Sequence, residues 1–281
     1  MKKYLSLIKF SHTIFAMPFA LIGFFLAKPH EFQWVILIYV ILCMIFARSA
    51  AMAFNRYIDR DIDKKNPRTA TVREIPSGKI KPSNALLFTI INALLFIITT
   101  YLINPICFKL SPIALIIILG YSITKRFTYL CHLFLGIGLA LAPIGSFLAV
   151  SGKFDILPIL FSVAVLFWVS GFDIIYALQD EEFDKNENLY SIPALIGVKN
   201  SMIISKILHF LTFITLLFAG LKYNFGIYYH IGFIIFTILL VYQHIIIKPN
   251  DLSKINLAFF TTNGIASVIF GLLVIIDILT V

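Results

Sequence analysis

The sequence predicts an all-α polytopic membrane protein, with about nine transmembrane helices in one bundle. Of its 281 residues, 60% are hydrophobic and 13% are charged, and the mean hydropathy is +0.94. Soluble domains carry about twice that share of charge. Apolar stretches close to the length that crosses a bilayer recur along the whole chain. No long polar stretch separates them, so we expect a single integral-membrane domain over residues 1–281.

The expected spans follow from these apolar stretches and from the turn and charge signals between them. The first stretch could be mistaken for a signal peptide. Its apolar run continues to Ala27 without a convincing cleavage site, so we interpret it as a retained span. The nine expected spans are residues 10–27, 34–54, 84–103, 110–124, 131–150, 157–179, 201–221, 227–247 and 256–279.

Basic residues indicate the orientation. The N-terminus and the regions after the second, fourth, sixth and eighth spans hold 18 of the 23 Lys and Arg residues. The other side holds Lys28, Lys109, Lys153 and Lys222, while Arg48 lies inside the second span. The positive-inside rule therefore predicts a cytoplasmic N-terminus and an external C-terminus, in a membrane such as the bacterial inner membrane. The same bias explains the net charge of +9 without a nucleic-acid partner.

Acidic residues concentrate at the cytoplasmic ends of two spans. Eight of the 14 Asp and Glu residues fall within residues 59–63 and 173–184. In each segment the spacing of polar side chains places them on one face of a continuing helix. These side chains are Asn55, Asp59 and Asp63 in the first segment, and Asp173, Tyr176, Asp180 and Asp184 in the second.

Two faces of like charge repel each other unless a cation lies between them. Hard carboxylate oxygens suit Mg²⁺, which completes its coordination with water and substrate phosphates. We therefore expect a diphosphate site held through Mg²⁺, with the metal ligands Asn55, Asp59, Asp63, Asp180 and Asp184. The alternative is that acids in loops are simply solvated. That explanation suffices for the four acids off the two faces, which are Asp61, Glu181, Glu182 and Glu187.

Basic side chains follow both segments and could bind the phosphate oxygens. The candidates are Arg68, Arg73, Lys125 and Arg126, on loops expected to close over the same mouth. Lys79 and Lys81 are better explained as ordinary positive-inside flanks, and Arg56 and Arg60 as residues at the membrane interface. The three cysteines lack CxxC spacing, so neither zinc nor a disulfide framework is indicated.

These motifs resemble those of the UbiA-type family of intramembrane prenyltransferases. NRYIDRDID at 55–63 matches the family's NxxxDxxxD motif, and DIIYALQDEEFD at 173–184 matches DxxY followed by DxxxD. NPRTATVREIPSG at 66–78 and YSITKRFTYLCHLFLG at 121–136 are similar to its flanking loops. Residues 10–23 and 177–197 resemble the 4-hydroxybenzoate polyprenyltransferase-like branch, which includes members of the futalosine route to menaquinone. One departure is the two residues between Ala70 and Arg73, where related sequences often have one.

The resemblance implies transfer of a polyprenyl group from its diphosphate to an aromatic acid acceptor. The acceptor would be 4-hydroxybenzoate or a hydroxynaphthoate, in ubiquinone or menaquinone biosynthesis. Tyr121 and Tyr176 could shield the allylic cation, and Asp173 could orient an acceptor hydroxyl or take its proton. The isoprenoid tail would need an apolar path that opens laterally to membrane lipid.

Two side chains within the expected spans have open roles. Arg48 or Arg126 could bind an acceptor carboxylate, although Arg48 could equally snorkel to the interface. His12 could line the substrate cavity, but a lone His near a helix start is more often a packing residue.

The main alternative function is an ion or solute transporter, since intramembrane acids also mark ion pathways. Transporters often contain two inverted halves with helices broken at mid-membrane, whereas here the acids lie at span ends. A structural protein with solvated acidic loops is the other alternative. Neither predicts two matched acidic faces.

Overall fold

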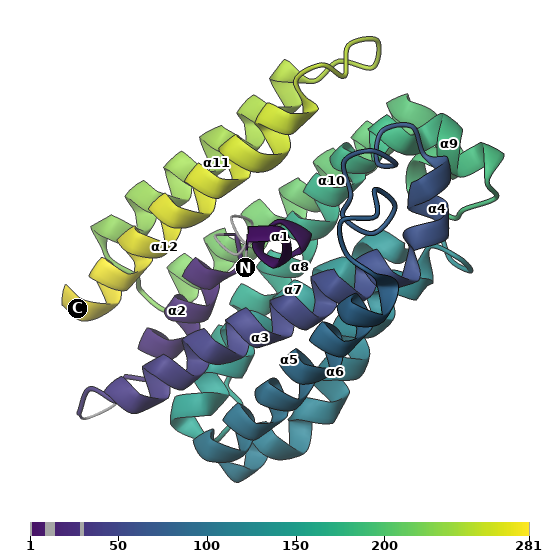
Figure 1. Cartoon of the computed structure of the whole chain (residues 1–281). Coiled ribbons are helices and arrows are strands. Elements are labelled where there is room, and N and C mark those ends of the chain that lie inside the picture. Colours follow the sequence, from purple (N-terminus) through teal and green to yellow (C-terminus); the bar gives the residue numbers. More distant parts are fainter. Residues whose placement is uncertain (1, 9–14, 29–30, 281) are drawn as a thin grey trace.

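Helices make up nearly all of the structure, a computed structural model that describes residues 2–8, 15–28 and 31–280 (Figure 1). Within those ranges there is no β-strand, only an isolated bridge between Lys248 and Asp251. The α-helices are α1 (Lys2–Leu7), α2 (Met17–Leu26), α3 (Trp34–Ile58), α4 (Arg60–Lys65), α5 (Pro82–Ile103), α6 (Pro105–Thr124), α7 (Cys131–Ser151), α8 (Ile156–Ala177), α9 (Glu181–Asn186), α10 (Ile192–Lys222), α11 (Ile227–Ile246) and α12 (Asn263–Thr280). A 3₁₀ turn, η2 (Leu178–Asp180), and a π-helical turn, η3 (Leu257–Thr262), extend two of them.

Eight helical segments among the described residues are long and apolar enough to cross a membrane. They correspond to the second through ninth predicted spans, so the all-α polytopic class is confirmed and the chain is an integral membrane protein. Helix α2 has 10 residues, about 15 Å of helix, which is half the thickness of a hydrocarbon core. Part of the first predicted span, with His12, lies outside the described residues. The count of nine and the orientation stay predictions.

Two spans begin earlier than predicted. Helix α6 starts at Pro105 because Asn104 accepts a hydrogen bond from the Cys107 amide at 2.9 Å, and proline fits the first turn of a helix. Helix α10 starts at Ile192 and includes Gly197, whose φ of 76° joins a short first helix to the long one. Glycine adopts a positive φ without strain, and a glycine at this position made the sequence predict a loop where the structure has the start of α10.

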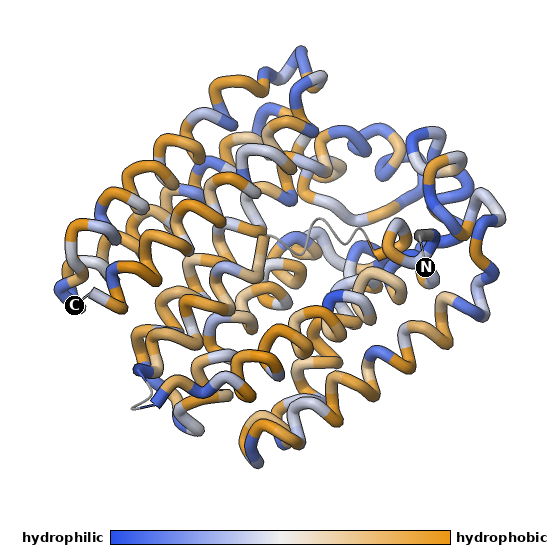
Figure 2. Tube along the Cα trace, turned by 60° about the vertical axis from the view of Figure 1, so that its left-hand side comes forward, coloured by the Kyte–Doolittle hydropathy of each residue, from blue (hydrophilic) through white to orange (hydrophobic). Residues whose placement is uncertain are grey.

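The helices form three groups that lie side by side (Figure 1). In the centre, α8 packs against both α7 and α10, and α3, α5 and α6 lie on one side of them. The pair α11 and α12 lies on the other side, and α2 contacts both α7 and α12. Hydrophobic residues line the helices, and hydrophilic residues gather in the connections at their ends (Figure 2).

An aromatic core joins α2, α8, α11 and α12. Trp168 lies 5.3 Å from Phe19 and 5.5 Å from Phe236, measured between ring centroids, and Phe270 completes the group. The Trp168 indole donates a hydrogen bond to Asn263 at 3.0 Å, which satisfies its polar atom inside the bundle. This core fixes α8, the helix that carries the second acidic segment.

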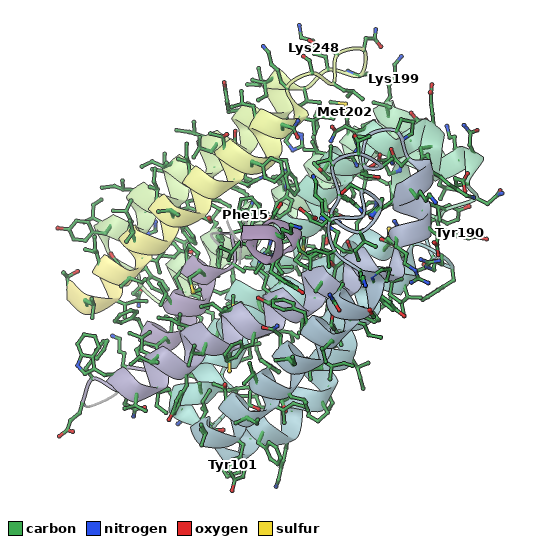
Figure 3. The ribbon with its side chains drawn as sticks, viewed as in Figure 1. Phe15, Tyr101, Tyr190, Lys199, Met202 and Lys248 are labelled. Atoms are coloured by element: carbon green, nitrogen blue, oxygen red, sulfur yellow. The ribbon has the colours of Figure 1, made fainter. Side chains whose placement is uncertain are left out.

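The polar connections that bear the acidic segments lie at one end of the bundle. Helices α4 and α9 are neighbours there, and Tyr190, from the connection between α9 and α10, lies beside them (Figures 1 and 3). Helix α1 packs against α3 and against the loop that follows α4. Leu7 of α1, Ala53 of α3 and Ile75 of that loop belong to one hydrophobic cluster. We call this region the mouth; it comprises residues 55–81, 121–132 and 173–192.

Candidate active site

The first acidic segment lies where α3 passes into α4. Helix α3 ends at Ile58, but the amides of Asp59 and Asp63 still donate to the carbonyls four residues before them, at 2.9 and 2.7 Å. The side-chain amide of Asn55 donates a hydrogen bond to the carboxylate of Asp59 at 3.1 Å. Helical hydrogen bonds therefore continue across the local break, and Asn55, Asp59 and Asp63 remain on one face, as the spacing predicts.

The two aspartates on the predicted face, Asp59 and Asp63, each pair with a cation from another part of the chain. Asp59 accepts from Lys125 at 3.0 Å and from Arg126 at 3.2 Å, both in the α6–α7 connection. Asp63 pairs with Arg73. Asp59 and Asp63 are buried, at 1% and 3% exposure, so these partners offset a desolvation cost that unpaired charges would bear.

The second acidic segment has a similar arrangement. Asp180 pairs with Arg68 through both of its oxygens, and it also accepts from the Asn66 side chain at 3.0 Å. The Arg68 guanidinium donates to the Tyr176 hydroxyl at 3.1 Å and lies 5.3 Å from the centroid of its ring. Burial alone lowers the pKa of Arg68, but Asp180 and Tyr176 outweigh it, and the pKa is raised above its ordinary value.

These contacts bring the two predicted segments to one mouth. Residues that follow the first motif, Asn66 and Arg68, bind the second motif directly. Asp184 is buried, and the charges of Asp180 and Lys125 both act on it. Since Lys125 also pairs with Asp59, one cation stands between the two acidic segments.

Asp173 lies one turn before Tyr176 on α8, and its side chain is 23% exposed. One of its oxygens lies 2.7 Å from Nδ1 of His132, at the start of α7. This pair could not be predicted, because periodicity within one helix carries no information about the residues of a neighbouring helix.

An apolar cavity of about 380 Å³ lies between α3, α5, α6 and α7. Its polar lining includes Arg48 and Tyr121. Tyr121, which lines the cavity, is also the first residue of the 121–132 segment of the mouth, so the cavity adjoins the mouth. The Nε atom of Arg48 is buried with no hydrogen-bond partner, so its guanidinium has donor capacity left inside the cavity.

The donor set fits a hard divalent cation. All five predicted ligands carry oxygen donors, and Oδ2 of Asp63 is buried without a hydrogen-bond partner. In the described part of the chain, however, no three His, Cys, Asp or Glu side chains form a ready-made metal cluster. The carboxylates instead hold Arg and Lys, so loading a metal requires these cations to move.

One interpretation of the sequence is wrong and two contributors were missed. Arg56 was expected at the membrane interface, but it is buried at 7% exposure and donates to Asn55 at 3.0 Å. Inside the mouth, the charge of Arg73 repels its guanidinium and the charge of Asp63 attracts it. Asn66 and His132 were missed, because both lie outside the acidic motifs and their partners are more than 40 positions away.

Comparison with known proteins identifies the family. Residues 16–265 match the UbiA prenyltransferase family. A relative named 4-hydroxybenzoate octaprenyltransferase, from Vesicomyosocius okutanii, is 31% identical over 84% of this chain and 85% of its own length. Another of that name, from Aliivibrio salmonicida, is 31% identical over 88% of this chain and 86% of its own length.

Solved structures agree. The apo structure of a UbiA homolog from Aeropyrum pernix K1 has a TM-score of 0.86 and 30% identity, covering 95% of this chain and 98% of that one. A UbiA homolog from Archaeoglobus fulgidus bound to DMAPP and Mg²⁺ has the same fold, with a TM-score of 0.76 and 22% identity, over 99% of this chain and 100% of that one. The fold and the match define a membrane-embedded prenyltransferase. This chain belongs to the UbiA prenyltransferase family.

Proposed function

We propose that the protein transfers a polyprenyl group from a polyprenyl diphosphate to the ring of an aromatic acid, in a Mg²⁺-dependent step of quinone biosynthesis. The observation that carries this is the mouth itself. Two acidic segments lie there interleaved with arginine and lysine, beside an apolar cavity that contains Arg48 and Tyr121.

The mouth has the groups that a diphosphate requires. Asn55, Asp59, Asp63, Asp180 and Asp184 would hold Mg²⁺, whose charge would neutralise the leaving diphosphate. The fold neighbour solved with DMAPP and Mg²⁺ supports this choice of metal. The four cations that now pair with or adjoin these acids would turn to the phosphate oxygens: Arg68, Arg73, Lys125 and Arg126.

The prenyl chain needs an apolar site and a protected reacting end. The cavity of about 380 Å³ is the size of an ordinary ligand site and is lined mainly by aliphatic side chains. Tyr121 on its wall and Tyr176 in the mouth present aromatic faces. Such faces stabilise a nearby positive charge, here the allylic cation left when the carbon–oxygen bond breaks.

The acceptor would bind between these groups. Relatives named 4-hydroxybenzoate octaprenyltransferase support 4-hydroxybenzoate, and a hydroxynaphthoate has the same combination of carboxylate and hydroxyl. The unpartnered Arg48 nitrogen favours this residue as a carboxylate ligand. Asp173 would accept a hydrogen bond from the acceptor hydroxyl and so increase the electron density of the ring.

The decisive experiment is a reconstituted reaction. Purified protein receives Mg²⁺, a polyprenyl diphosphate and either 4-hydroxybenzoate or 1,4-dihydroxy-6-naphthoate. We expect prenylated product and pyrophosphate in equal amounts with one of the acceptors, and neither product in EDTA. Asp59→Ala and Asp180→Ala should remove activity while the protein still folds; near-normal turnover in both would overturn the metal site.

The same protein in proteoliposomes tests the alternative. A prenyltransferase should not move radiolabelled solute or Mg²⁺ across the bilayer. Flux through the wild type, combined with no prenylated product for any acceptor or chain length, would replace the proposal with a transport function.

A further inference from the structure

His132 is a buried imidazole that the motifs do not include. It is the second residue of α7, and its side chain is 3% exposed. Nδ1 lies 2.7 Å from Oδ2 of Asp173, and Nε2 lies 3.4 Å from the backbone nitrogen of Ile192. Its own carbonyl accepts from Ser170 at 3.2 Å. The ring is therefore held on both edges, between α8 and the start of α10.

These contacts define the roles of the two ring nitrogens. A backbone N–H can only donate, so Nε2 of His132 is the acceptor in its contact with Ile192. The ring proton of the neutral imidazole is then on Nδ1, where it is donated to Asp173. A carboxylate held in this way keeps one orientation.

The pair leaves one oxygen of Asp173 for another partner. Oδ2 is bound by His132, and among the described residues the structure gives Oδ1 no hydrogen-bond partner. The Asp173 side chain is 23% exposed against 3% for His132. Asp173 lies one turn before Tyr176, so its open oxygen is on the part of α8 that borders the mouth.

We propose that His132 is a positioning residue, which holds the Asp173 carboxylate so that its Oδ1 receives the hydroxyl of the aromatic acceptor. This inference rests on the proposed function. His132 touches neither substrate; it acts through Asp173 by fixing its rotamer and leaving a single acceptor oxygen. The effect should therefore fall on the step that involves the acceptor, and not on binding of the prenyl diphosphate.

A purely structural role predicts something different. The connection between α9 and α10 is already attached to the α6–α7 connection, because the Tyr190 amide donates to the Lys125 carbonyl at 2.7 Å and Cys131 contacts the Tyr190 carbonyl at 3.4 Å. If His132 only filled space there, any side chain of similar size would serve. If it orients Asp173, a donor at the Nδ1 position is required.

Three substitutions separate these roles. Asparagine reproduces the Nδ1 edge of histidine, glutamine reaches the Nε2 edge, and leucine fills space without a donor. We expect His132→Asn to keep kcat within about threefold of the wild type, and His132→Gln and His132→Leu to lose about tenfold or more. KM for the prenyl diphosphate should stay unchanged in all three. Phe134→Leu, two residues later on α7 and 39% exposed, is the matched control and should keep kcat.

A double-mutant cycle with Asp173→Asn completes the test. If His132 acts only through Asp173, His132→Leu should cost nothing further in the Asp173→Asn background. Equal kcat for the leucine and asparagine variants, or fully additive losses in the cycle, would overturn the inference while the proposed function stands. Absence of prenylated product from the wild type would overturn the proposed function, and this inference with it.

Discussion

Charged residues in the mouth neutralise one another across segments that are distant in sequence. Asp59, Asp63 and Asp180 each hold at least one arginine or lysine from another segment. Buried charges of one sign are costly to leave unpaired, so each pair stabilises the resting structure. Under the proposed function, the same pairs would supply carboxylates for the metal and cations for the diphosphate.

Arg68 should be the most sensitive of the phosphate-binding candidates. It contacts both oxygens of Asp180 and the Tyr176 hydroxyl, a geometry that requires a planar guanidinium. We expect Arg68→Ala to raise KM for the prenyl diphosphate about tenfold or more, with Arg68→Lys only partly restoring it. Steady-state pyrophosphate release measures this. Lys79→Ala, at an exposed site, is the control; equal KM values for the lysine variant and the wild type would contradict the prediction.

Tyr176 should act through its ring more than through its hydroxyl. Its face lies 5.3 Å from the Arg68 guanidinium, and it packs 4.3 Å from the ring of Phe259. We expect Tyr176→Phe to keep kcat within about threefold, because the aromatic face remains, and Tyr176→Leu to lose about tenfold. Turnover at saturating concentrations of both substrates measures the difference. Indistinguishable kcat values for the two variants would rule out a role for the aromatic face.

The candidate site could be predicted residue by residue only where spacing within one helix carried the information. Asn55, Asp59 and Asp63 were found because four-residue spacing is visible in the sequence. Their basic partners were named only as phosphate-binding candidates and His132 was missed, because nothing local in the sequence pairs Arg73 with Asp63 or His132 with Asp173.

At the scale of helices, close approaches decide how elements pack. Gly23 in α2 faces α7 so closely that an added Cβ would lie 2.0 Å from the Pro143 carbonyl oxygen. The backbone of α7 cannot yield at that point without moving the helix. Asp277 of α12 similarly ties two helices, because it accepts from the amides of Gly226 and Tyr229 at the start of α11, at 2.7 and 3.1 Å.

Gly23→Ala should therefore destabilise the bundle. Forcing an extra methyl group into a packed contact costs about 1–3 kcal/mol. Thermal unfolding in detergent should show a lower midpoint than that of the wild type. Gly120→Ala is the matched control, since an added Cβ there meets nothing within 4 Å and alanine favours a helix by about 0.5–1 kcal/mol. A Gly23→Ala midpoint at or above that of Gly120→Ala would contradict the packing argument.

Helix positions were predictable because each depends on the length of one apolar stretch and on the turn residues at its two ends. Spans such as residues 131–150 and 227–247 agree with α7 and α11 within a residue or so. The early start of α10 was not predictable, because a glycine at position 197 indicates the end of a helix and the structure instead joins two helices there, with a positive φ. The short helices α4 and α9 are part of the mouth, and α1 packs against it through Leu7, so none of the three is marked by a long apolar stretch.

At the scale of the molecule, the charge bias predicts that the mouth faces the cytoplasm. By the predicted spans, the acidic segments fall on the same side as the 18 basic residues of the predicted inner regions. Lys79 and Lys153 are both exposed and belong to connections expected on opposite sides of the membrane.

Site-directed labelling tests this orientation. In a background without the three native cysteines, Lys153→Cys should react with an impermeant maleimide added to intact cells. Lys79→Cys should react only after the membrane is opened. The reverse pattern would invert the topology and place the mouth outside.

The ion pairs of the mouth have a consequence for the stability of the protein without a bound metal. Because each acidic segment has its own arginine or lysine, the chain does not need a bound metal to hold its charged ends together. A chelator should therefore stop turnover without lowering the unfolding temperature. A drop of several degrees in EDTA would mean that metal is part of the scaffold. On this view the protein stays folded without bound metal or diphosphate, because its buried acidic side chains are neutralised by arginine and lysine.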